Sequence, residues 1–142
     1  MSNGYEIMWQ LGEPWQDFTA ELSSGVHTVV TASLALHVID MDAGFHLRST
    51  GVHWMLFDDT PRRLDEIAYA SSCGMHMIGG EPGAWHATTP LILVVRGEVR
   101  DFTTLRARPA IEQAARTRGW DLTGHPTQRC QALHCLLKGP RE

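Results

Sequence analysis

The chain has 142 residues, a formal net charge of −4 and 43% hydrophobic residues. That length suits one domain, and the apolar content is enough to offset the entropy of ordering the chain, so we predict a single globular domain over residues 1–142. The mild net charge gives no general attraction to nucleic acid. No apolar run approaches the roughly 20 residues needed to cross a bilayer, so no membrane partner is expected.

The cysteines and the N-terminus bear on the compartment. The first residues lack the basic region and apolar block of a signal peptide. Three cysteines, Cys73, Cys130 and Cys135, are an odd number. Together these features predict reduced thiols and a cytoplasmic protein.

In chain order, Tyr5 to Leu11 reads as a first strand, ended by Gly12-Glu13-Pro14. Trp15 to Leu22 is consistent with one or two helical turns or with an irregular cover over the core. Val26 to Asp40 fits two structures: its apolar residues alternate as in a strand, but Val30, Leu34, Val38 and Met41 also form a helical stripe. Asp42-Ala43-Gly44 predicts a turn in either case.

Phe45 to Phe57 is expected to be extended. Asp59-Thr60-Pro61 has the polar cap and first-turn proline of a helix start, and apolar residues follow at helical spacing to Ser71. Gly74 then supplies the stop. We therefore predict a helix over residues 59–71.

Met75 to Ile78 is consistent with a short strand, and Thr89 to Val99 with a buried central strand. A second helix is predicted from Pro109 to Gly119, and a last strand from Arg129 to Lys138. The predicted fold class is α+β, with a central mixed or antiparallel sheet of about five to seven strands and two or three helices.

Two functional hypotheses come from residue types alone. One is a zinc-binding domain that uses Cys73, His76, Cys130 and either His134 or Cys135, which are the nitrogen and sulfur ligands that zinc prefers. The other is a non-enzymatic protein-binding module of the inhibitor or immunity type, because tryptophan is over-represented in interface hot spots. An exposed apolar patch with two or more rings would support this second hypothesis. The chain has five tryptophans: Trp9, Trp15, Trp54, Trp85 and Trp120.

A third hypothesis starts from a pattern of segments. In GVHWMLFDDTPRRLDEIAYA, from Gly51 to Ala70, a glycine precedes an aromatic-rich stretch, a D-x-P-type cap and a Tyr-Ala end. LILVVRGEVRDF, from Leu91, and AIEQAARTRGWDL, from Ala110, follow downstream. This order resembles small ADP-ribosyltransferase-like domains over roughly the last two thirds of the chain.

The resemblance implies an NAD-binding transferase that acts on a macromolecular target. It assigns cofactor binding to His27, which would contact the adenosine ribose, and to Tyr69, which would stack on nicotinamide. No glutamate lies between Trp120 and Lys138, so the resemblance leaves Asp121 as the catalytic carboxylate, and the departure also fits a descendant that only binds. The hypothesis requires Thr31 to Met41 to be a helix.

Overall fold

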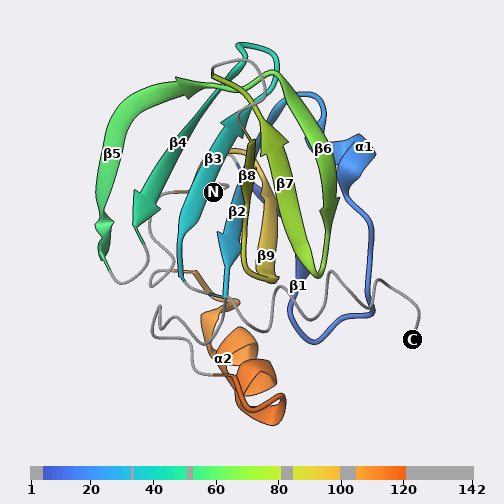
Figure 1. Ribbon diagram of the computed structural model, residues 1–142. Helices are drawn as coiled ribbons and strands as arrows, with labels where there is room; N and C mark the ends of the chain where they lie inside the picture. Colours follow the sequence, from blue (N-terminus) through green and yellow to red (C-terminus); the bar gives the residue numbers. More distant parts are fainter. Residues whose placement is uncertain (1–4, 33, 51–52, 81–84, 100–104, 121–142) are drawn as a thin grey trace.

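The computed structural model describes residues 5–32, 34–50, 53–80, 85–99 and 105–120, without the side chains of residues 49–50, 53–61 and 85–86 (Figure 1). Within these residues the chain forms β1 (Glu6–Gln10), α1 (Thr19–Leu22), β2 (Val26–Thr31), β3 (Leu36–Asp40), β4 (Phe45–Thr50), β5 (His53–Arg63), β6 (Glu66–Ser71), β7 (Gly74–Ile78), β8 (Trp85–Ala87), β9 (Leu91–Arg96) and α2 (Arg108–Thr117).

The strands form two antiparallel sheets. The larger has six strands in the order β1-β9-β2-β3-β4-β5, and the smaller has three in the order β6-β7-β8. The fold is therefore broadly α+β, as predicted, but it is dominated by its sheets. The larger sheet has a strand number within the predicted range, whereas the smaller sheet was not foreseen.

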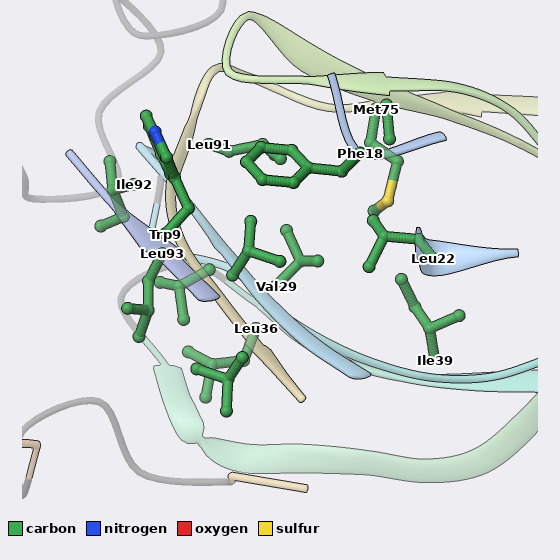
Figure 2. Packing of buried hydrophobic residues seen from close by; sticks show 14 of the residues in the cluster. Trp9, Phe18, Leu22, Val29, Leu36, Ile39, Met75, Leu91, Ile92 and Leu93 are labelled. Atoms are coloured by element: carbon green, nitrogen blue, oxygen red, sulfur yellow. The ribbon is translucent and has the colours of Figure 1, made fainter. Parts of the chain in front are cut away.

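The small sheet and α1 cover one face of the large sheet. Figure 1 shows β6, β7 and β8 in front of β2 and β9, with α1 beside β6. In the core between them, Phe18 and Leu22 of the α1 region lie beside Val29, Ile39 and Met75 (Figure 2). All five side chains are fully buried. Residues far apart in sequence therefore hold the two sheets together by apolar burial.

The second helix lies apart from the small sheet, at one end of the large sheet (Figure 1). Its residues Ile111 and Ala115 belong to the same hydrophobic cluster. A proline stands near its first residue and Gly119 follows it with φ +75°, which matches the predicted start and stop.

The helix expected from Thr31 to Met41 is wrong. This stretch contains the end of β2 and all of β3, and β3 pairs with β4, for example His37 with Arg48. Both β2 and β3 are internal strands with nearly every side chain buried. A strand buried on both faces has no polar alternation, so a run of apolar residues fits a helical stripe equally well.

The helix predicted over residues 59–71 is also wrong, because β5 and β6 occupy this stretch. Leu64, Ile67 and Ala70 are buried at every third position, which imitates a helical period. The spacing arises from the break between the two strands and from an irregularity in the β6–β7 pairing between Ile67 and Tyr69. A bulge of this kind shifts the alternation by one residue.

Pro61, the proline of the predicted first helical turn, lies within β5. The strand β5 is at the edge of the large sheet. A proline is tolerated there because the side of an edge strand that faces away from the sheet needs no N–H donor.

The strands predicted at Tyr5–Leu11, Met75–Ile78 and Thr89–Val99 are confirmed as β1, β7 and β9. The turn at residues 42–44 is confirmed, with Gly44 at φ +78°. The strand predicted at Arg129–Lys138 lies outside the described residues. Neither helix in the described part of the chain has the length and apolar character needed to cross a membrane.

Candidate functional site

The connection between β1 and α1 is an exposed segment that is held in place by its neighbours. We call residues Gly12–Asp17 the Trp15 segment. On the β1 side, the indole Nε1 of Trp9 donates a hydrogen bond to the carbonyl oxygen of Pro14 at 2.9 Å. The backbone N–H of Glu13 donates to the carbonyl of Gln10 at 3.1 Å. Because Trp9 is only 2% exposed, its indole is a fixed support for the segment.

The other end of the Trp15 segment is attached to the end of β6. The N–H of Gln16 donates to Oγ of Ser72 at 2.9 Å, and the N–H of Ser72 donates to the carbonyl of Gln16 at the same distance. Immediately beyond the segment, the N–H of Phe18 donates to the carbonyl of Ala70 at 2.7 Å. These bonds connect positions more than 50 residues apart, so the segment is fixed by tertiary structure.

Trp15 is presented to solvent on this support. Its exposed fraction is 38%, and no other large hydrophobic side chain in the described part of the chain is classed as exposed. The carboxylates Glu13 and Asp17 flank it, and Glu21 follows on α1; all three are exposed. The chain has no lysine or arginine before Arg48. The Trp15 segment therefore combines one exposed aromatic ring with two exposed carboxylates of its own.

A second feature of interest is His27, which lies in β2 in the middle of the large sheet. Its exposed fraction is 3%, and its Nδ1 atom has no hydrogen-bond partner. Its cross-strand neighbours are Arg96 in β9 and Ile39 in β3. Burial lowers the pKa of His27, the positive charge of Arg96 lowers it further, and the carboxylate of Glu21 opposes this shift. The neutral imidazole is thus the form that the fold favours.

The two predicted cofactor-binding residues lie in different sheets. His27 lies in the large sheet and Tyr69 in the small one, and no hydrogen bond or ring contact joins these two described residues. Instead, the hydroxyl of Tyr69 donates a hydrogen bond to Oγ of Ser71 at 2.8 Å. The rings of Tyr69 and His76 pack edge-on, with their centroids 6.1 Å apart. Asp121, the predicted catalytic carboxylate, lies outside the described residues.

Only two of the predicted zinc ligands, Cys73 and His76, lie within the described residues. Cys73 is buried and disulfide-bonded, which corrects the prediction of reduced thiols and prevents this sulfur from acting as a thiolate ligand. His76 is half-buried, and Cys130, His134 and Cys135 lie outside the described residues. Among the residues that are described, no group of three or more metal-binding side chains occurs. Sequence reasoning missed the disulfide because pairing depends on the distance between sulfurs in the fold.

Among the three tryptophans whose side chains the structure describes, Trp15 alone is exposed, so these three do not form a multi-ring patch. Trp9 is buried, Trp120 is half-buried against the core, and Trp15 is exposed. The side chains of Trp54 and Trp85 are outside the described part of the structure. Residue composition did not distinguish Trp15 from the other four rings. The Gly-Glu-Pro turn directly before it is a local signal that could have done so, because such turns are commonly exposed.

No pattern in the sequence indicated which charged residues would lie near His27. Arg96 is 69 positions away in the chain and becomes its neighbour only through the pairing of β2 with β9. Glu21 acts on it because α1 turns directly into β2.

Comparison of the chain with models of protein families, with curated proteins and with solved structures finds no match, so the site must be interpreted from its own geometry.

Proposed function

We propose that this chain is a non-enzymatic protein-binding module, and that the Trp15 segment is its contact surface for a partner with basic side chains. The observation that supports this most directly is the exposure of Trp15 on a segment that is held by hydrogen bonds on both sides. The proposal keeps one of the hypotheses drawn from composition but rests it on a single ring.

An exposed indole on a fixed support suits recognition for an energetic reason. Burying the ring in a partner removes apolar surface from water and contributes favourably to association. Binding is weakened when a flexible loop must be ordered first. The bonds from Trp9 and Ser72 already order the Trp15 segment in the free protein, so this entropic cost is small.

The charge around Trp15 favours a basic partner. Glu13, Asp17 and Glu21 are exposed, and no lysine or arginine stands within the first 47 positions of the chain. Complementary charge accelerates encounter and disfavours partners of like charge. We therefore expect a contact surface with lysine or arginine around an apolar recess, and we expect phosphate-rich partners to be repelled.

The NAD-binding transferase remains a separate hypothesis with less support. Its required helix after His27 is a strand, and its two cofactor-binding residues lie in different sheets. The catalytic role of Asp121 in this hypothesis rests on the sequence resemblance alone, because the residue lies outside the described part of the structure.

The experiment compares Trp15→Ala with the natural chain. Both are immobilised as full-length proteins and exposed to extract of the source cells, and proteins retained only by the natural chain are identified, purified and titrated. Loss of a central tryptophan contact typically costs about 2 kcal/mol or more, so we expect a Kd at least roughly 30-fold weaker for Trp15→Ala. Arg63→Ala, which removes another large exposed side chain, is the matched control and should bind normally.

Salt provides a second readout, because screening should weaken binding to the natural chain. A purified partner that binds Trp15→Ala and the natural chain equally would refute the proposal, as would the absence of any partner that distinguishes them. Calorimetry with millimolar NAD tests the transferase hypothesis in parallel. Heat that disappears in a His27 variant would favour that hypothesis instead.

A further inference from the structure

His27 is a buried titratable group that the proposed binding surface does not use. Its imidazole lies at the boundary between the large sheet and α1: its cross-strand partner Ile39 lies beside Leu22 of α1 (Figure 2). The turn between α1 and β2 is close to the ring, since a Cβ added at Gly25 would lie 3.7 Å from the ring carbon Cε1.

The charged groups around His27 come from several elements. Arg96 of β9 is its cross-strand neighbour and forms an exposed ion pair with Glu6 of β1 at 3.2 Å. Glu21 of α1 contributes negative charge. On the β3 side the direct neighbour, Ile39, is apolar, and the next residue in this row is His46 of β4.

The turn before β2 is also tied to an acid. The N–H of Gly25 donates to Oδ1 of Asp42 at 3.1 Å, and the β3–β4 turn supplies this carboxylate. Asp42 therefore already has a backbone donor. Glu21 is the carboxylate that favours the charged imidazole, whereas Arg96 disfavours it.

We propose that protonation of His27 loosens α1 from the large sheet, so that the contact between this helix and the sheet weakens at acidic pH. The neutral ring can place its proton on Nε2, which leaves Nδ1 as a buried acceptor without a donor. The imidazolium must donate from both nitrogens, and Nδ1–H then has no acceptor. A buried donor without a partner, close to Arg96, favours movement that brings water or Glu21 to the ring.

Of the elements near His27, α1 is the one that we expect to move. It has four residues, and its N-cap, Phe18, makes no side-chain capping bond. Within the turn, the N–H of Leu22 donates to the carbonyl of Phe18 at 2.9 Å and that of Ser23 to Ala20 at 3.2 Å. Isolated turns this short are unstable, so α1 is kept in place by tertiary contacts. Phe18 and Leu22 are buried, and at its first residue Oγ1 of Thr19 accepts the N–H of Ala70 at 3.0 Å. The remaining contact with the large sheet, through Leu22, is apolar. By contrast, β2 is paired with β3 from Val26 to Val30 and with β9 from His27 to Thr31, with one irregularity between Val30 and Thr31.

The test is amide hydrogen exchange on the free full-length protein, corrected for the intrinsic pH dependence of exchange. Between about pH 7.5 and about pH 5, we expect the protection factors of the Leu22 and Ser23 amides to fall at least about tenfold, while those of β9 fall no more than the free energy of unfolding measured over the same pH range requires. In His27→Leu, the α1 amides should change less than about twofold. His76→Gln removes a half-buried histidine from the small sheet and should retain the full effect.

An NMR titration of the His27 ring in the natural chain supplies a measurement that needs no variant, and His27→Gln replaces His27→Leu if the latter fails to fold. A ring that titrates at or above the ordinary pKa of about 6.5 would overturn the proposal. So would an acid-induced loss of α1 protection that persists in the His27 variants. The experiment uses no partner, so its result is independent of whether the Trp15 segment binds one.

Discussion

The hydroxyl of Thr28 joins β2 to the chain that leaves β9, and its removal gives a sharp test of the fold. Thr28 is fully buried. Its Oγ1 donates to the carbonyl of Gly97 at 2.8 Å and accepts the N–H of Val99 at 2.9 Å. Thr28→Val keeps the shape and the strand preference of the side chain but removes both bonds.

The expected magnitude follows from the burial of the two backbone groups. Val99 is buried, so its N–H loses its partner without access to bulk water. A buried group left unsatisfied costs about 1–3 kcal/mol. Gly97 is half-buried, so its carbonyl regains part of its hydration. We expect Thr28→Val to lower the free energy of unfolding by about 2–3 kcal/mol. The N–H of Val99 contributes nearly the full cost of an unsatisfied buried group, and the carbonyl of Gly97 contributes part of it.

Urea denaturation followed by circular dichroism measures this change. With a slope of about 1–3 kcal/mol per molar urea, the midpoint should fall by roughly 1 M. Thr28→Ser is the control: it keeps the hydroxyl and loses one methyl group, at a cost of about 1 kcal/mol. If Thr28→Val were no less stable than Thr28→Ser, the buried hydrogen bonds would not contribute as argued.

Three further outcomes are expected. Gly79→Ala should destabilise the fold by about 1–3 kcal/mol in the same denaturation assay, because the added Cβ would overlap the carbonyl oxygen of Arg63; unchanged stability would contradict that close packing. His27 has a lowered pKa in the folded state, so the unfolded chain takes up this proton first. The stabilisation that comes from keeping His27 neutral is complete above about pH 6.5 and is lost as the pH falls toward the folded-state pKa. Over this range the free energy of unfolding should fall by at most about 1.4 kcal/mol per pH unit. Urea midpoints measured across pH should show this slope, and His27→Leu should remove it. Asp65→Asn breaks an exposed ion pair with Arg63 and should leave the denaturation midpoint unchanged within error; a clear drop would show that the pair matters more than its exposure indicates.

Local patterns in the sequence were sufficient where an element had an unambiguous period or boundary. The run from Leu91 to Val95 identified β9, because only a buried strand or a buried helix contains such a run and this one is too short for a helix. The proline and glycine around residues 109–119 identified α2. Gly12-Glu13-Pro14 correctly marked the end of β1, whereas the exposure of Trp15 was not predicted, and His27 entered only through the resemblance to a family.

Tertiary structure decided the rest, because the causes lie outside any local window. Burial of β2 and β3 on both faces concealed their strand character, and the irregularity at Ile67 gave β6 the spacing of a helix. The support of Trp15 by Trp9 and Ser72 depends on contacts between distant segments, as does the position of His27 between charges from β9 and α1. Residue types can be read along the chain, whereas exposure, hydrogen-bond partners and local charge exist only after the two sheets have packed together.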